Sequence, residues 1–241
     1  TAICTRDDIM TYLIHTGVEN GLAFKIMESV RKGKGLTEDM EKAMREAGVE
    51  DWYIESCKRI KYMFPKAHAV AYVMMAFRIA YFKVFYPLAY YAAFFSIRAK
   101  AFDYQLMCQG REKLESTMRD YKKRYNELSK KEQDSYNDMK IVQEMYARGF
   151  EFMPIDIFRA KANHFQVVDG KLMPALSTID GMGGQAAEGV VKAAKHGPFS
   201  SRENFKLRAK ISGTVVEKMA EMGILGDLPE TDQMSLLDFM A

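Results

Sequence analysis

The sequence predicts a mainly α-helical chain of the α+β class, with a small α+β module toward its C-terminal end. Apolar residues recur at helical spacing through the first hundred residues, whereas short alternating apolar runs occur only after Gly149. Between these regions lies a charged helical arm that is poor in aliphatic residues. With 241 residues, of which 48% are apolar, the chain can form one large domain or two modest ones.

Cysteine usage and the start of the chain bound the class of protein. Cys4, Cys57 and Cys108 are widely spaced and odd in number, which fits neither a disulfide framework nor a zinc knuckle. They indicate free thiols in a reducing cytosol. The chain opens at Thr1 without a signal peptide or an initiator methionine. We therefore expect a cytoplasmic fragment of a larger protein.

Helical signals organise the first part of the chain. Residues 5–30 read as helix, which Gly17 and Gly21 divide into two pieces. The basic loop Arg31–Gly35 follows, and its glycines either let the backbone approach a ligand closely or belong to a solvated turn. Thr37 then caps the next helix, whose first turns are acidic.

The stretch between Ser56 and Phe102 contains no Asp or Glu. Its basic residues are Lys58, Arg59, Lys61, Lys66, Arg78, Lys83, Arg98 and Lys100. They are interleaved with many Phe and Tyr, and basic charge mixed with aromatic rings favours a polyanion-binding surface. A membrane span is the alternative, because residues 67–85 are strongly apolar. Arg78 and Lys83 interrupt this run before about 18 uncharged residues accumulate, so we reject the span.

The segment Met63–Tyr72 opens a long predicted helix. Pro65 suits a first helical turn, and Lys66 and His68 lie beside the helix N-terminus, whose free N–H groups and partial positive charge favour an anion. Tyr72 lies one turn beyond His68 on the same face and offers a ring on which a base can stack. The alternative is a core helix with a buried histidine and tyrosine.

The composition changes twice more along the chain. From about Arg111 to Tyr146, charged residues predict a solvated helical pair that local ion pairs stabilise more than burial does. We assign no chemistry to this pair and expect it to space two parts. After Gly149, alternating apolar runs around Pro154 predict strands, with Asp169-Gly170 as a tight hairpin turn.

Two glycine-containing turns precede helices in the C-terminal module. In the first, Gly181 and Gly183 let the backbone turn tightly and approach a phosphate closely. About 30 residues further along the chain, Ser212 and Gly213 belong to a second turn, which is a degenerate copy of the first. Two tandem helix-hairpin-helix units would contact the sugar-phosphate backbone of a duplex without reading its sequence. The alternative is that the glycines are simple helix caps.

Two segments are similar to the fingers region of the PolC-type alpha subunits of bacterial DNA polymerase III. Residues 63–72 read Met-Phe-Pro-Lys-Ala-His-Ala-Val-Ala-Tyr, and their Phe-x-Lys-x-His-x-x-x-Tyr core resembles the wider bacterial alpha-subunit family. Residues 24–35 end in Arg-Lys-Gly-Lys-Gly, which is closer to the PolC type. The resemblance covers nearly the whole chain and is weakest over residues 104–146.

The resemblance implies four parts. Residues 1–103 are similar to the C-terminal part of the fingers, residues 104–148 to a charged helical connector, and residues 149–227 to a duplex-binding domain with tandem helix-hairpin-helix units. Residues 228–241 resemble a flexible tail with a clamp-binding motif. The expected partners are primer–template DNA, an incoming dNTP, a sliding clamp and the remaining polymerase domains, with no membrane.

The resemblance also suggests roles for individual residues. The expected nucleotide-binding residues are Lys66, His68, Tyr72, Lys61, Arg31 and Phe64; the expected DNA-binding residues are Gly181, Gly183, Ser212 and Gly213; the expected clamp-binding residues are Gln233, Met234, Leu236 and Leu237. The tail departs from the clamp motif Gln-Leu-Ser-Leu-Phe, because Leu237 replaces its aromatic anchor. Phe239 is the nearest substitute.

Members of this family carry out the chemistry with palm-domain aspartates that hold two Mg²⁺ ions. We find no such carboxylate set in the sequence, so we expect the Mg²⁺ ligands outside this chain, no catalytic residue within it, and no polymerisation by the fragment alone. Two alternatives remain. One is a free-standing, non-enzymatic helix-hairpin-helix DNA-binding module, and the other is a structural scaffold whose basic aromatic region is only a core.

Overall fold

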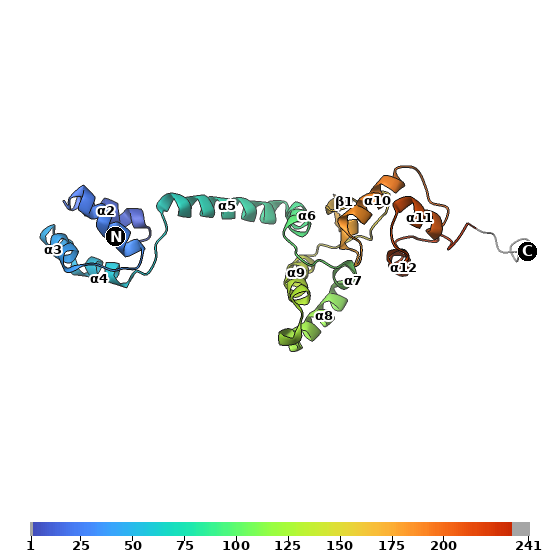
Figure 1. The fold of residues 1–241 in the computed structure, drawn as a ribbon, viewed down its shortest axis with the longest axis horizontal. Helices are drawn as coiled ribbons and strands as arrows, with labels where there is room; N and C mark the ends of the chain where they lie inside the picture. Colours follow the sequence, from blue (N-terminus) through green and yellow to red (C-terminus); the bar gives the residue numbers. More distant parts are fainter. Residues whose placement is uncertain (1, 233–241) are drawn as a thin grey trace, which may run out of the picture. The chain divides into compact units, whose positions relative to one another are not determined.

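The computed structural model describes residues 2–232 and divides the chain into two compact units, Thr1–Ala80 and Tyr81–Ala241. Helices make up most of both units, and the sheet among the described residues has only two short strands (Figure 1). The prediction of a mainly α-helical chain with a small α+β part is therefore confirmed.

The first unit contains α1 (Arg6–His15), α2 (Asn20–Arg31), α3 (Glu38–Glu46), α4 (Asp51–Arg59) and most of α5 (Lys66–Phe85), which continues into the second unit. The second unit continues with α6 (Pro87–Ile97), α7 (Tyr104–Met107), α8 (Arg111–Lys123), η1 (Tyr125–Glu127), α9 (Lys130–Ala147), β1 (Gln166–Val168), β2 (Lys171–Met173), η2 (Leu176–Thr178), α10 (Gly184–Ala194), α11 (Arg202–Ala209) and α12 (Gly213–Glu221).

The core of the first unit is formed by apolar side chains of α1 to α4. Its largest fully buried members are Ile9, Leu13, Ile26, Met44, Tyr53 and Ile54. Gly17 follows the end of α1 with a φ of +97°, as the sequence predicts. Gly21 does not break the helix as expected. It lies in the first turn of α2, where the Glu19 carboxylate accepts its N–H at 2.7 Å and thereby caps the helix.

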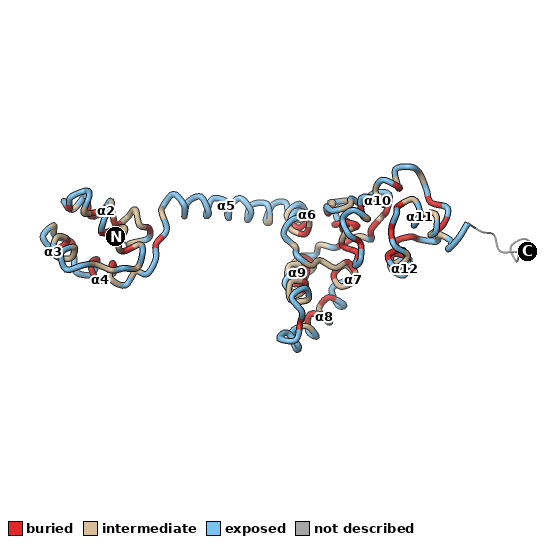
Figure 2. The backbone as a smooth tube through the Cα atoms, in the orientation of Figure 1, coloured by how far each residue is buried: buried red, intermediate tan, exposed pale blue. Residues whose placement is uncertain are grey.

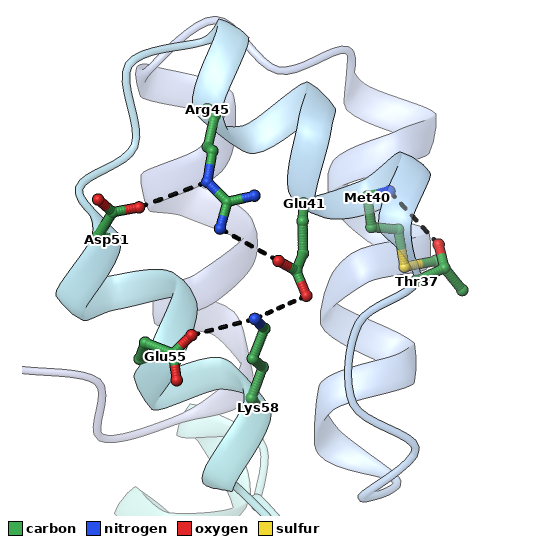
Figure 3. Close-up of polar contacts among 7 residues, drawn as sticks. All are labelled: Thr37, Met40, Glu41, Arg45, Asp51, Glu55 and Lys58. Atoms are coloured by element: carbon green, nitrogen blue, oxygen red, sulfur yellow. Dashed lines mark hydrogen bonds and ion pairs between the residues drawn. The ribbon is translucent and has the colours of Figure 1, made fainter.

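A network of ion pairs connects α3 to α4 (Figure 3). The Glu41 carboxylate lies 2.8 Å from Nζ of Lys58 and 3.2 Å from the Arg45 guanidinium, which also contacts Asp51 at 3.4 Å. Lys58 makes a further ion pair with Glu55 at 3.0 Å. The first basic residue of the acid-free stretch is therefore neutralised by acids from outside it.

Helix α5 has no buried residue among those described, as the pale blue trace in Figure 2 shows. Tyr72 and Phe77 expose 68% and 73% of their surface. The alternative of a core helix with Tyr72 buried does not hold among the described residues of this chain. By length and composition α5 is the one described helix that could cross a membrane, with a mean hydropathy of 1.2. Arg78 and Lys83 lie within this helix, and they are the ground on which we reject a membrane span. That rejection stays a prediction.

The charged helical pair, α8 and α9, differs from the expected solvated arm. The two helices pack side by side (Figure 1), and five of their apolar side chains are buried in a core. These side chains are Leu114, Met118, Met139, Val142 and Met145. Burial in a shared core with α6 and the small sheet therefore holds the pair in place, in addition to its surface ion pairs. The charged composition of the outer faces masked this inner stripe.

The small sheet is an antiparallel hairpin. Val167 pairs with Leu172, and the turn residues Asp169 and Gly170 have φ values of 51° and 75°, as a tight two-residue turn requires. The predicted hairpin is confirmed. The further strands expected around Pro154 are not formed; only a single bridge joins Phe152 to Leu172, and the chain then loops through the core.

The packing of α10 against α11 depends on a glycine. A Cβ atom added at Gly189 would lie 2.3 Å from the carbonyl oxygen of Ala209, closer than any side chain can approach a backbone. The absence of a side chain at this position therefore sets how closely the two helices approach.

We predict that Gly189→Ala lowers the free energy of unfolding by about 1 to 3 kcal/mol, because the added methyl group must separate α10 from α11. Chemical denaturation followed by circular dichroism measures the change. Gly183→Ala is the matched control, since its φ is −71° and nothing lies within 4 Å of the added atom. Equal stability of the two variants would contradict the prediction.

Candidate nucleic-acid interface

The first hairpin connects η2 to α10. Gly181 has a φ of +86°, which favours glycine, and the N–H of Met182 closes the turn onto the carbonyl of Ile179 at 2.9 Å. Gly183 occupies the N-cap position of α10 and supplies no side-chain cap. The first N–H groups of α10 are therefore left for an external acceptor, and no Cβ atom shields them at Gly183.

The second hairpin connects α11 to α12 and repeats this arrangement with different residues. Lys210 adopts the left-handed conformation at a φ of 55°, the role that Gly181 has in the first copy. Ser212 is the N-cap of α12, and its hydroxyl accepts the N–H of Val215 at 3.4 Å. The Ser212 side chain is thus engaged in capping, whereas Gly213 begins the helix without a side chain.

A basic groove of about 690 Å³ joins the two copies. It is lined by Gly183, Gln185, Ala186, Gly189, Lys192, Arg208, Ala209 and Lys210. Lys192 and Lys210 are exposed, and no carboxylate lines the groove. Sequence reasoning did not select these two lysines, although Lys210 lies in the motif of the second copy.

Arg208 has a structural role in the same groove. Its guanidinium donates to the carbonyls of Pro198 at 2.7 Å, Ala193 at 2.8 Å and Gly197 at 3.1 Å, and it lies 4.3 Å from the centre of the Phe199 ring. Because these contacts use its donors, Arg208 fixes the connection between α10 and α11.

Three of the predicted nucleotide-binding residues form an aromatic ladder at the start of α5. The rings of Phe64 and His68 are stacked at 5.2 Å, and those of His68 and Tyr72 lie 4.5 Å apart. Phe64 and Tyr72 expose 51% and 68% of their surface. The spacing of four residues places His68 and Tyr72 on one face of α5, as the sequence analysis expected, and Phe64 stacks on His68 from the segment just before the helix.

Lys66 is engaged by acids of α1. Its Nζ atom lies 2.6 Å from Oδ1 of Asp8, and its backbone N–H donates to Oδ2 of Asp7 at 2.6 Å. The Lys66 ammonium, together with N–H groups of Thr5 and Cys4, lowers the pKa of Asp8 to about 2. The helix N-terminus and its lysine therefore do bind anions here, namely the carboxylates of Asp7 and Asp8 in the same chain.

Arg31 is likewise paired within the first unit. Its guanidinium forms a two-point contact with Glu28, which also lies 2.9 Å from Lys32, and these cations lower the pKa of Glu28 to about 2. The backbone N–H of Met63 donates to the Arg31 carbonyl at 3.3 Å. The segment that contains Lys61 therefore lies beside Arg31, as a shared site would require.

Gly33 lets these two segments approach. Its φ is +70°, and an added Cβ atom would lie 2.4 Å from the Lys61 carbonyl oxygen. Asp8, which holds Lys66, was not selected by sequence reasoning, because nothing in the spacing along the chain pairs α1 with α5. Glu28, which holds Arg31, was not selected either, although its position three residues before Arg31 on α2 is a sequence signal for the pair. The predicted clamp-binding residues Gln233, Met234, Leu236 and Leu237 lie outside the described residues.

Comparisons with known proteins give one motif and a set of relatives that share one name. A profile described as "Helix-hairpin-helix motif" matches residues 149–234. The chain is 50% identical over 99% of its length to a DNA polymerase III PolC-type of Streptococcus suis, and 48% identical over 99% to that of Staphylococcus saprophyticus. It is 49% identical over 97% to that of Thermotoga petrophila. The chain spans 17% of the length of each of these relatives.

We predict that Lys66→Met raises the pKa of Asp8 from about 2 toward 3.8, because the ammonium that stabilises the charged carboxylate is lost. Since the folded-state pKa is depressed, the carboxylate stabilises the fold above pH 4 and this contribution is lost as the pH falls toward 2. NMR titration of the Asp8 carboxyl carbon measures the shift. Lys34→Met is the control in the same unit. If Asp8 titrated with the same midpoint in both variants, the pairing of Lys66 with Asp8 would be refuted.

Proposed function

We propose that this chain is a segment of a PolC-type DNA polymerase III. In this proposal it holds primer–template duplex and incoming nucleotide for a DNA-directed DNA polymerase in the bacterial cytoplasm. The observation that carries the proposal is the pair of hairpins joined by an acid-free basic groove. The chain that contains them has 50% sequence identity to such a protein. The chain acts in this proposal as a binding part of a nucleotidyltransferase.

Duplex DNA is the substrate that fits the two hairpins. The uncapped N–H groups at Gly183 and the start of α12 at Gly213 would donate to phosphate oxygens, and Lys192 and Lys210 would neutralise neighbouring phosphates. In this arrangement the main-chain donors and the two lysines would contact phosphates and not base edges. The proposed binding is therefore independent of sequence, as a replicative enzyme needs.

The incoming dNTP is proposed to bind at the start of α5. Lys66, with Arg31 or Lys61, would neutralise the triphosphate, and the ladder of Phe64, His68 and Tyr72 would line the nascent base pair. In the described structure Asp8 and Glu28 hold Lys66 and Arg31. Nucleotide binding would therefore exchange carboxylates for phosphates, and the acids would hold the cations in place between turnovers.

The chemistry itself is assigned to other parts of the longer protein. Two Mg²⁺ ions would activate the primer 3′-oxygen and stabilise the leaving pyrophosphate. Residues 2–232 present no group of three His, Cys, Asp or Glu side chains placed to hold a metal. We also propose that Gln233–Leu237, with Phe239 as apolar anchor, binds the sliding clamp.

A free-standing DNA-binding module is the alternative. It would use only the hairpin region, which is the part that the helix-hairpin-helix profile matches. Against it, the identity to polymerases extends over 99% of the chain and so includes α1 to α9. The two proposals differ in whether Lys66 and Tyr72 matter for nucleotide use.

We predict that the 241-residue chain binds a DNA duplex with an affinity that falls steeply between about 50 and 200 mM salt, because phosphate contacts release counterions. Gly213→Glu should weaken binding about tenfold or more, since a carboxylate at the start of α12 repels the phosphate that its N–H groups bind. Fluorescence anisotropy measures both effects. Asn20→Glu is the matched control, as it adds the same charge at the first position of α2. Salt-independent affinity would favour a scaffold.

In a whole polymerase that contains this segment, we predict that Lys66→Ala and Tyr72→Ala each lower kcat/KM for dNTP by about tenfold or more, because triphosphate charge and base-pair stacking lose a partner. Single-nucleotide incorporation kinetics measure the change. Tyr81→Ala is the matched control, since Tyr81 lies nine residues further along α5 and hence on its opposite face. Unchanged kinetics in Lys66→Ala and Tyr72→Ala would favour the DNA-binding module.

A further inference from the structure

A carboxylate lies in the turn of the first hairpin, one residue before Gly181. Oδ2 of Asp180 is 2.8 Å from Nζ of Lys218 on α12, and Oδ1 is 3.4 Å from Nζ of Lys131 on α9. These contacts, that with Lys218 first, lower the pKa of Asp180, so the carboxylate is charged at neutral pH. One side chain thus joins the first hairpin to the second copy and to the charged helical pair.

A groove of about 770 Å³ lies beside the same hairpin. Helix α9 lines it with Lys131, the loop 100–103 lines it with Lys100, and residues 180–183 of the hairpin complete it. Lys131 exposes 77% of its side chain, and Lys100 is also exposed. The buried Asp138 carboxylate fixes the loop, because it accepts the N–H groups of Lys100 and Ala101 at 2.9 and 2.8 Å.

The three carboxylates that line this groove are all engaged within the protein. Asp103 accepts the N–H of Leu106 at 3.0 Å, and Glu132 accepts the N–H and the hydroxyl of Ser129 at 2.8 and 2.7 Å. Asp180 is held by its two lysines. In contrast, Lys100 has no acidic partner within 4 Å among the described residues. Lys100 is therefore an available charge on this surface, and Lys131, although paired with Asp180, keeps 77% of its side chain exposed.

We propose that helix α9 extends the duplex-binding surface beyond the hairpins, with Lys131 as a phosphate contact and Asp180 as the residue that positions it. The proposal rests on the proposed duplex binding. A sugar-phosphate backbone that follows the first hairpin passes the groove, where Lys131 and Lys100 face it. The charged helical pair then has a binding role, in addition to separating two parts of the chain.

Removal of the Asp180 charge can change duplex affinity in either direction, depending on the role of this residue. A carboxylate near phosphates repels them, so its simple removal should strengthen duplex binding. If Asp180 instead holds the hairpin against α9 and α12, Asp180→Asn should weaken binding about three- to tenfold, the scale of a lost coupling between neighbouring residues. The sign of the change separates the two cases without any assumption about its size.

The experiment measures duplex affinity of the whole 241-residue chain by fluorescence anisotropy across the same salt range. Lys131→Ala should reduce the slope of log affinity against log salt by about one, because one phosphate contact is lost. Lys130→Ala is the matched control. The Lys130 side chain is 78% exposed on the same helix turn and pairs with Asp134 at 3.0 Å instead of with the hairpin. The slope of log affinity against log salt should therefore stay unchanged in Lys130→Ala.

The outcomes separate this inference from the proposed function. If the unmodified chain shows no salt-dependent duplex binding, the proposed function itself fails. If it binds, but Lys131→Ala matches Lys130→Ala or Asp180→Asn strengthens binding, only the role of α9 is refuted. Thermal unfolding of each variant checks that the fold is kept. Asp180→Glu, which retains the charge, should restore part of the affinity lost in Asp180→Asn and thereby support a positioning role.

Discussion

The approach of α10 to α11 at Gly189 is the contact on which the arrangement of the two hairpins depends. Because the Ala209 carbonyl occupies the place of a side chain, the two hairpins are held at a fixed separation, with one basic groove between them. Arg208 reinforces this contact by binding the carbonyl of Ala193 near the end of α10 and the carbonyls of Gly197 and Pro198 in the segment that follows. Phosphates along a duplex have a regular spacing, so two rigidly related turns can contact a backbone that one turn would hold only loosely.

Cations held by internal carboxylates occur near the start of α5 and beside α9, although not in the basic groove between the two hairpins. Asp8 holds Lys66, Glu28 holds Arg31, and Asp180 holds Lys131. Exposed pairs of this kind contribute little to stability, since water and salt screen them. Their consequence is conformational: a long side chain that is already oriented loses less entropy when it binds a phosphate. Local acids can thereby prepare a basic surface for an anionic ligand.

Helix α5 shows why part of the structure could be predicted and part could not. Its start at Lys66 and the single face shared by His68 and Tyr72 follow from local periodicity. The pairing of Lys66 with Asp8 does not follow from local periodicity, because Asp8 is far away in sequence. The stripe of α8 and α9 that is buried against α6 was likewise hidden, since charged outer faces dominate the composition of that segment.

The sequence by itself determined the helical class, the hairpin turn at Asp169-Gly170, the two glycine-containing turns and the acid-free stretch. All of these depend on residues that are close along the chain, where propensity and spacing act directly. Only the tertiary structure decided that Lys210 takes the left-handed position in the second hairpin, that Gly189 sets the helix separation, and that Asp180 joins three elements. These features depend on contacts between distant segments, which chain packing creates and local sequence does not encode.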